Sequence, residues 1–393
     1  MQLQVKESSD YIALAQSLAE EFAQTAIARD TEAGTPKQER DRLRQSNLLK
    51  LIIPKEYGGL GETWITALQI TREFAKVDSS IAHIFSYHHL GAVVPHIFGS
   101  PEQKQRYYTQ TARNNWFWCN ALNPLDRRAT LTPEGDYFRL DGIKSFCSGS
   151  KDSDFIPITA TDRDTNEFTI LVIPTQREGV NIQSDWDNMG QRQTDSGSII
   201  FDHVLVHPDE ILGSRELNSQ PFVTIRACLT QLNFTNIYLG IAQGALAAAK
   251  QYTRTTTKPW LTSGAESATQ DPYILQHYGS MWVDLQAATC LTDKAGELLQ
   301  AAWDRQWELT AAQRGECAVA IATAKVAATK VGLEIANRIF EVMGARATSN
   351  QYSFDRYWRN LRTFTLHDPV DYKLRDIGNW VLNDELPQPS FYS

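Results

Sequence analysis

The region after Pro221 constrains the fold most strongly, because three long segments there carry apolar residues at helical spacing. They span residues 236–256, 271–305 and 315–344, and each is longer than the roughly 8–20 residues of an ordinary globular helix. Their many Ala and Gly residues let helices approach closely, and such faces suit a bundle that also buries surface against other subunits. The sequence therefore predicts a C-terminal helical bundle domain over residues 221–393.

Two different patterns precede this bundle. Residues 1–112 show helical apolar spacing interrupted by a turn cluster at 54–61, which predicts an N-terminal helical domain. Residues 113–220 instead predict a small β domain, a barrel or sandwich. The fold class is thus mainly α with a central β domain. The β-type runs, each bounded by turn signals, lie at 137–140, 155–158, 168–173 and 198–201.

Charge and composition argue against several partners. With a net charge of −8, a pI of about 5.6 and no long Lys/Arg block, the chain lacks the basic face that nucleic acid binding requires. No window approaches the ~18 apolar residues needed to span a bilayer, and the polar N-terminus shows no leader peptide. We therefore expect a cytoplasmic protein that does not contact a membrane. Five scattered cysteines without CxxC spacing predict reduced, mostly buried thiols rather than a disulfide framework or a zinc site.

Two nucleotide-binding motifs are missing from the sequence. It has neither GxGxxG after a predicted strand nor GxxxxGK followed by Ser or Thr. We therefore expect no Rossmann-type NAD(P)H site and no P-loop. If the chain is a redox enzyme, it must receive its electrons from a source other than a nicotinamide cofactor bound in a Rossmann-type site.

Several long motifs point to one family. They are PKEYGGLG in the first helical region, NNWFWCNA, FCSGSKDSD and DWDNMGQRQTDSGS in the β region, and YTRTTTKPW, FDRYWRN and LHDPV towards the end. With the α–β–α order, they resemble the acyl-CoA dehydrogenase superfamily over nearly the whole chain. Within it they resemble the two-component flavin monooxygenase branch that includes dibenzothiophene and sulfone monooxygenases.

The resemblance implies an acyl-CoA dehydrogenase-like fold, a homotetramer, and reduced FMN delivered by a separate NAD(P)H:FMN reductase. In this branch a C4a-hydroperoxyflavin transfers one oxygen atom of O2 to the substrate, which here would be a thioether, sulfoxide or sulfone. Reduced FMN, the reductase, O2 and an organosulfur substrate are therefore the expected cofactor and partners.

The same resemblance marks His367 and Asp368 as the active-site pair. In acyl-CoA dehydrogenases a catalytic Glu follows an Arg by nine residues, whereas counting from Arg359 reaches Asp368, with His367 before it and Pro369 after it. A histidine can exchange protons near neutrality. Alternatives remain: polar residues capping a helix before a proline, an FAD-dependent acyl-CoA dehydrogenase with Asp368 as base, an N- or aromatic hydroxylase, or a non-catalytic flavin-binding scaffold.

Further site residues come from the first helical region. His83 and Tyr87 are four residues apart and share a helical face. By resemblance His83 and Tyr87 are catalytic and, with His88, line the substrate pocket. The cluster of histidines from His83 to His96 also suggests a metal site, but no carboxylate or Cys completes it at short range, so we expect no metal.

Cofactor contacts are assigned by the matching motifs. Asn120 and Ser148 would hydrogen-bond the flavin ring, with Ser148 also counted as catalytic, and Trp186 would pack against the ring. The ordinary alternatives are a β-turn and a core aromatic residue. The candidate residues for the FMN phosphate are Arg254, Lys258 and Arg346, with solvated helix-terminal cations as the alternative.

Overall fold

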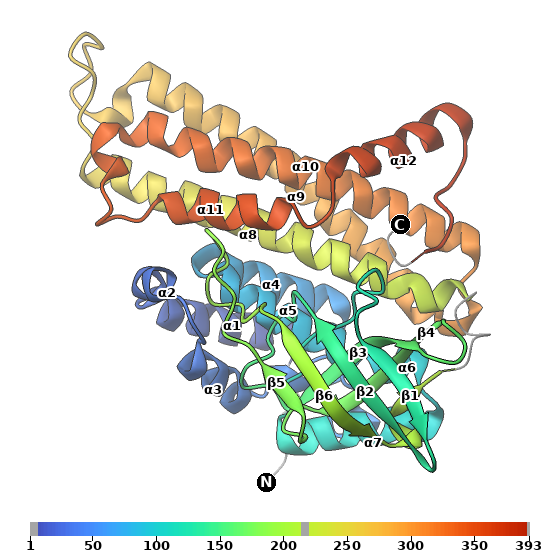
Figure 1. The fold of residues 1–393 in the computed structure, drawn as a ribbon. Coiled ribbons are helices and arrows are strands. Elements are labelled where there is room, and N and C mark those ends of the chain that lie inside the picture. The colour runs from blue at the N-terminus through green and yellow to red at the C-terminus, as the bar shows by residue number, and fades with distance from the viewer. Residues whose placement is uncertain (1–6, 214–219, 391–393) are drawn as a thin grey trace.

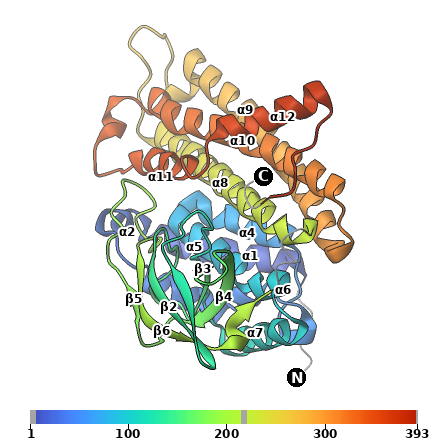
Figure 2. The same ribbon diagram turned by 45° about the vertical axis from the view of Figure 1, so that its right-hand side comes forward.

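The structure is a computed structural model that describes residues 7–213 and 220–390. Helices form the first and last parts of the chain, and a β-sheet lies between them (Figure 1). The long C-terminal helices extend across both the N-terminal helices and the sheet, and the turned view in Figure 2 places the N-terminal helices beneath them. This is the predicted fold class, mainly helical with a central β domain.

The N-terminal helices form the first layer. They are α1 (Ser8–Ala23), α2 (Ala26–Glu32), α3 (Lys37–Ser46), α4 (Trp64–Val77), α5 (Ser79–Ala92), α6 (Val94–Phe98) and α7 (Pro101–Asn114). The break between α4 and α5 is a single residue, Asp78, in an extended conformation. Its carboxylate accepts from the backbone N–H groups of Ser80 and Ile81, which satisfies donors that the first turn of α5 leaves free. Asp78 thereby sets where α5, with His83 and Tyr87, begins.

The central sheet has the strand order β5-β6-β2-β1-β3-β4-β7. Neighbouring strands are antiparallel except β1 and β3, which are parallel. Alternate residues of β6 are buried and form, with the other strands, a core of their own. The strands are β1 (Thr130–Glu134), β2 (Tyr137–Lys144), β3 (Phe155–Asp162), β4 (Phe168–Pro174), β5 (Val180–Ile182), β6 (Ile199–Val206) and β7 (Ile211–Leu212).

The C-terminal helices are α8 (Ile225–Thr255), α9 (Pro272–Asp304), α10 (Ala311–Met343), α11 (Asp355–Thr365) and α12 (Val370–Asn383). Helix α8 is buried along most of its length between α4 and α10. Gly240 and Gly244 permit the close approach to α4, since a Cβ on Gly244 would lie 1.9 Å from the carbonyl oxygen of Lys76. Among the described residues, no helix is both long and apolar enough to cross a membrane.

Candidate active site

The N-terminal side of the site is the pair His83 and Tyr87 on α5. Their rings stack at 4.2 Å between centroids, one helical turn apart, and both side chains are buried. Burial, reinforced by the charge of His367, lowers the pKa of His83 to about 3. His83 is therefore neutral at pH 7, and neither ring nitrogen has a hydrogen-bond partner among the described residues.

The opposite side is the link between α11 and α12, which carries His367 and Asp368. Phe234 of α8 and Phe364 of α11 join the two sides. Phe364 lies 4.8 Å from the His83 ring and Phe234 lies 4.5 Å from the His367 ring, between centroids. We call His83, Tyr87, Phe234, Phe364 and His367 the aromatic cluster. The structure thus brings together predicted residues that are almost 300 positions apart in sequence.

Asp368 is the acceptor at the centre of a polar cluster. Its Oδ2 accepts from His367 Nδ1 at 3.0 Å, from Gln231 Nε2 at 2.6 Å and from Lys325 Nζ at 3.0 Å. Burial alone would raise the pKa of Asp368, but the hydrogen bonds and charges of His367 and Lys325 hold it far below its usual range. Asp368 is therefore a firmly ionised carboxylate.

Lys325 and Gln231 were not predicted from the sequence. Lys325 lies on α10 and Gln231 on α8, and Lys325 Nζ also donates to Gln231 Oε1. A detectable signal existed, because Lys325 follows Ala318 and Ile321 on the buried face of an Ala-rich helix. A lone lysine on such a face needs a partner, and Asp368 is that partner.

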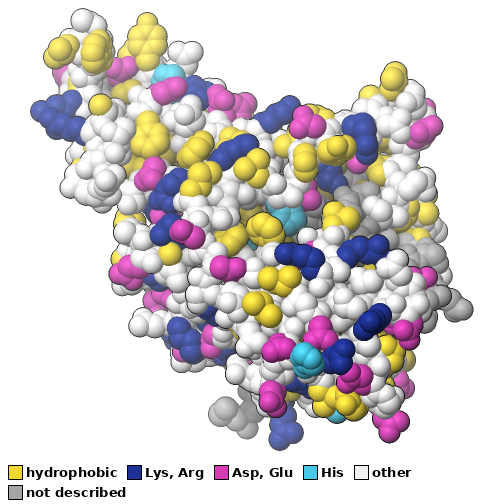
Figure 3. Space-filling model, viewed as in Figure 1, with side chains coloured by type: hydrophobic (Ala, Val, Ile, Leu, Met, Phe, Trp, Pro, Cys, Tyr) yellow, Lys and Arg dark blue, Asp and Glu magenta, His cyan; other side chains and the backbone are white. Residues whose placement is uncertain are grey.

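Exposure falls from His367 into this cluster. The side chain of His367 is 47% exposed, that of Asp368 18%, and that of Lys325 1%. Figure 3 shows the same face as Figure 1, with hydrophobic and basic side chains gathered along the boundary between the C-terminal helices and the sheet. His367 is thus accessible from solvent, while its supporting carboxylate and ammonium groups are not.

Asn120 and Ser148 meet at the end of the β domain nearest α8. The backbone N–H of Asn120 donates to the Ser148 carbonyl at 3.0 Å, and the Ser148 hydroxyl lies 2.8 Å from the Ser196 hydroxyl. Arg226, in the first turn of α8, donates from Nη2 to Asn120 Oδ1 at 2.8 Å. Arg226 was also missed by the sequence analysis, and its charge acts on Tyr87. It therefore connects the β-domain residues to the aromatic cluster.

Trp186 lies on the loop between β5 and β6. Its indole N–H donates to the Gln191 carbonyl at 2.8 Å, and its ring meets Phe146 edge-on at 6.2 Å. A buried ion pair of 2.7 Å between Arg40 and Asp195 anchors this loop to α3. The Trp186 side chain is partly exposed.

His88, predicted to line the substrate pocket, lies in different surroundings from His83 and Tyr87. The ring is fully buried, and Trp118 N–H donates to its Nδ1 at 3.1 Å while its Nε2 pairs with the Leu49 carbonyl at 2.5 Å. Both nitrogens are thus used by backbone groups. On a helix, a residue next to Tyr87 points away from the face that Tyr87 and His83 share. A substrate-binding role for His88 stays a prediction.

The predicted phosphate ligands are far from the flavin-ring candidates within one chain. Arg254 lies 28 residues after Arg226 on α8, a distance of about 40 Å at the helical rise per residue. Asn120 is hydrogen-bonded to Arg226, at the N-terminal end of α8. An FMN molecule has only a five-carbon chain between ring and phosphate, so Arg254 cannot reach a ring held at Asn120 of its own chain. Lys258 follows Arg254, and Arg346 follows α10.

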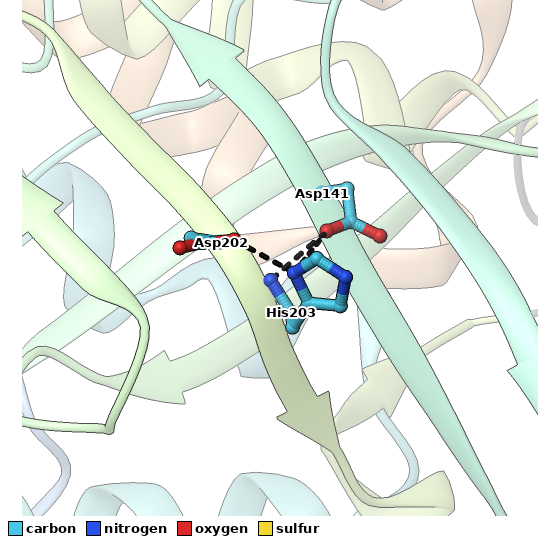
Figure 4. A group of neighbouring side chains, drawn as sticks. All are labelled: Asp141, Asp202 and His203. Carbon is cyan, nitrogen blue, oxygen red and sulfur yellow. Dashed lines mark hydrogen bonds and ion pairs between the residues drawn. The ribbon is translucent and has the colours of Figure 1, made fainter.

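The described residues include one group with potential metal-ligand spacing, and it lies elsewhere. Asp141, Asp202 and His203 place their ligand atoms within 4.8 Å of one another on β2 and β6 (Figure 4). His203 Nδ1 already pairs with Asp202 at 2.7 Å, and Asp141 pairs with Arg139 at 2.6 Å. These are solvent-exposed ion pairs on the sheet surface. A cavity of about 720 Å³ between α10, α12 and the C-terminal tail also contains none of the predicted site residues.

Comparisons with known proteins define the family. Models described as the N-terminal, middle and C-terminal domains of acyl-CoA dehydrogenase match residues 10–115, 123–204 and 232–372. The chain is 50% identical to a probable FMNH2-dependent monooxygenase, SfnC, of Pseudomonas putida, over 97% of both chains. It is 43% identical to the dibenzothiophene monooxygenase of Rhodococcus erythropolis, over 98% of this chain and 96% of that one.

A solved structure agrees with these relatives. The methanesulfinate monooxygenase MsuC of Pseudomonas fluorescens superimposes with a TM-score of 0.95 at 50% identity, covering 97% of this chain and 99% of the other. The chain therefore belongs to the acyl-CoA dehydrogenase family. Within that family it is a flavin monooxygenase whose cofactor is reduced FMN, as the sequence motifs predicted.

The residues present fit a flavin ring. Among the described residues, the Nε of Arg226 and both ring nitrogens of His83 are buried without hydrogen-bond partners. These atoms belong to α5 and to the start of α8, which contacts Asn120 of the β domain. Trp186 offers an apolar wall, and Asn120 and Ser148 offer polar groups nearby. This combination of donors and an apolar face is what a bound isoalloxazine requires. The individual ligand roles of Asn120, Ser148 and Trp186 remain predictions.

Proposed function

We propose that this flavin monooxygenase transfers one oxygen atom of O2 to a small organic sulfur compound, with His367 as the acid–base group. One observation carries the proposal: the His367 ring packs against Phe234 on one side and pairs with the ionised Asp368 on the other. Its relatives named above act on sulfur compounds or are FMNH2-dependent, which supports the substrate class.

Bound reduced FMN supplies the electrons and the site of reaction with O2. The chain's own residues then position the substrate and move a proton to or from the bound groups. Since Asp368 accepts from Nδ1 of His367, Nε2 is the nitrogen that exchanges a proton with bound groups. Lys325 and Gln231 hold Asp368 in place, and neutral His83 offers a donor or acceptor without adding charge. Phe234 packs against His367, and Phe364 packs against His83.

The dehydrogenase alternative fails on the chemistry of Asp368. A base that removes a proton from carbon needs an accessible carboxylate of raised basicity. Asp368 is instead 18% exposed, and its Oδ2 accepts three hydrogen bonds, two of them from cationic or potentially cationic groups. Its low pKa makes it a weak base. N- and aromatic hydroxylation would use the same groups, and the sulfur compounds named for the relatives favour sulfur over these.

We further propose that a separate NAD(P)H:FMN reductase supplies reduced FMN in the cytoplasm, and that the protein is a homotetramer. Exposed apolar residues on α9 and α12 support assembly, among them Trp282, Val283, Val381 and Leu382. In an assembly, Arg254, Lys258 and Arg346 of one copy would bind the FMN phosphate of another. This arrangement removes the distance problem noted above.

The function is tested by oxygen transfer with supplied reduced FMN. The isolated protein with FMN should oxidise NAD(P)H negligibly, and adding a flavin reductase should start conversion of a thioether, sulfoxide, sulfone or sulfinate. His367→Ala should still bind FMN but lose product by about 10²–10⁴-fold, while oxygen uptake continues and hydrogen peroxide accumulates.

The matched control is His203→Ala, which removes an exposed histidine of the sheet surface. It should leave both product and peroxide yields unchanged. Full coupling of oxygen uptake to product in His367→Ala would refute the acid–base role. If the wild type oxygenated none of these sulfur classes, the function itself would be refuted.

A further inference from the structure

Cys228 and Cys317 form a thiol pair between two packed helices. Cys228 lies near the start of α8 and Cys317 near the start of α10. Both side chains are buried and both thiols are free. The Cys317 thiol donates a hydrogen bond to the Cys228 sulfur. The two sulfur atoms are therefore already neighbours in the reduced protein.

The surroundings make Cys228 the more reactive member of the pair. The hydrogen bond from Cys317 lowers the pKa of the Cys228 thiol against the effect of burial, and the positive charges of Arg314 and Lys373 lower it further. The same hydrogen bond, together with burial, raises the pKa of Cys317. Because the thiolate is the nucleophilic form of cysteine, Cys228 is placed to attack an oxidant and Cys317 to follow as a thiol.

A small cavity gives the Cys228 sulfur room for a reactant. Cys228, Gln231, Lys325 and Lys373 line it, together with apolar residues of α10. Its volume is about 10 Å³, close to the space that one water molecule requires, so only a molecule near that size can reach the sulfur. Gln231 and Lys325 also donate to Asp368. The cavity therefore adjoins the groups that hold the active-site carboxylate.

We propose that Cys228 and Cys317 are a peroxide-sensitive modification site, in which hydrogen peroxide oxidises Cys228 and Cys317 then closes a disulfide between α8 and α10. Reduced flavin that reacts with O2 without transferring oxygen to a substrate releases hydrogen peroxide. The enzyme's own cofactor thus supplies the oxidant next to the cavity. This chemistry does not depend on which sulfur compound the enzyme oxygenates.

The modification balances in two steps. The Cys228 thiolate attacks one oxygen of hydrogen peroxide, the O–O bond breaks, and a sulfenic acid and one water form. The Cys317 thiol then attacks the oxidised sulfur, an S–S bond forms, and the sulfenic oxygen leaves as a second water. Two thiols and one hydrogen peroxide give one disulfide and two waters, with two electrons passing from sulfur to oxygen. The bridge would join α8 to α10 one helical turn from Gln231.

The test is peptide mapping of the full chain by mass spectrometry, after exposure to hydrogen peroxide and alkylation without a reductant. A peptide that links Cys228 to Cys317 should appear, and dithiothreitol should remove it. Cys119 and Cys147 are internal controls, because they are equally buried and burial raises the pKa of both. They should lose their thiols at least about tenfold more slowly than Cys228. All samples carry Cys290→Ser, since Cys290 is exposed and can link separate chains.

Two variants separate the steps. Cys317→Ala removes the second thiol and should leave a sulfenic acid on Cys228 that dimedone traps, whereas Cys228→Ala should give neither the bridge nor the adduct. An unmodified Cys228 in the chain that retains both thiols would overturn the proposal without touching the proposed function. Oxidation of Cys119 or Cys147 as fast as Cys228 would overturn it too, because the surroundings of Cys228 would then confer no reactivity. Neither of these outcomes requires a variant at the pair to fold.

Discussion

Four buried histidines should make the protein unstable in mild acid. Burial lowers the pKa of His83 to about 3 and of His88 and His96 to about 4, and the pKa of His89 lies well below its usual range. In the unfolded chain each returns to about 6.5. Because the folded pKa is the lower one, the stabilising contribution is present above pH 6.5 and is lost as the pH falls towards the folded values.

The size of the effect follows from proton uptake. For each proton bound on unfolding, the free energy of unfolding falls by about 1.4 kcal/mol for every unit by which the pH is lowered. Between pH 7 and pH 5 each histidine therefore lowers the free energy of unfolding by about 2 kcal/mol, and the four together by about 8 kcal/mol, which is a large part of the typical stability of a domain. Most carboxylates titrate below this window, so they contribute little to it.

The measurement is urea unfolding of the FMN-free protein at several pH values. His89→Phe is the informative variant, since His89 is fully buried, packs edge-on against Phe85 at 4.6 Å and has no hydrogen-bond partner for either nitrogen among the described residues. In this variant one fewer proton should be bound on unfolding, so the free energy of unfolding should depend less steeply on pH. His203→Asn, at an exposed site whose pKa is raised by Asp202, should not flatten it. Equal stability at pH 7 and pH 5, or an unchanged slope in His89→Phe, would contradict this reasoning.

Three further predictions follow from buried charges and exposed apolar faces. Asp195→Asn should lower the free energy of unfolding by about 3–5 kcal/mol, because it leaves Arg40 buried without its carboxylate. The control, Asp187→Asn at an exposed position on the same loop, should change the melting temperature little. Lys325→Met should raise the pKa of Asp368, and the acidic limb of the activity–pH profile should move to higher pH; an unmoved limb would show that Lys325 does not tune the pair. Light scattering should give a mass about four times the 44.3 kDa of one chain, and a monomer at micromolar concentration would rule out the assembly.

Much of the fold was predictable from local patterns. The runs at 155–158 and 168–173 became β3 and β4, because alternating or continuous apolar residues between turns leave few other choices. Helix α8 was predicted from residue 236 but begins at Ile225. Its first eleven residues mix Thr, Cys, Gln and Asn with apolar residues, and they are helical because they are buried on nearly all sides. Such tertiary burial is invisible to a periodicity argument.

From the sequence, only residues within recognisable motifs could be proposed for the site. His83 and Tyr87 fall on one face by helical spacing. His367 was noticed because it precedes Asp368, which stands where acyl-CoA dehydrogenases have their catalytic Glu. Gln231 and Arg226 lie in that same poorly patterned start of α8, so nothing in the local sequence indicated that they face Asp368 and Asn120. Their roles follow from the packing of α8 against the link between α11 and α12, which no local pattern specifies.

The length of α8 also explains why catalysis and assembly should depend on each other. Its first turns carry Arg226 and Gln231, which contact the site, and its last turn carries Arg254 about 40 Å away. If Arg254 binds FMN phosphate at all, it must do so for another copy of the chain. Substituting Arg254 should then weaken FMN binding without disturbing the contacts of His367. Mixing the Arg254 variant with the His367→Ala variant should restore some functional sites, because a site with His367 from one chain can take Arg254 from the other. A set of contacts confined to one chain could not produce that complementation.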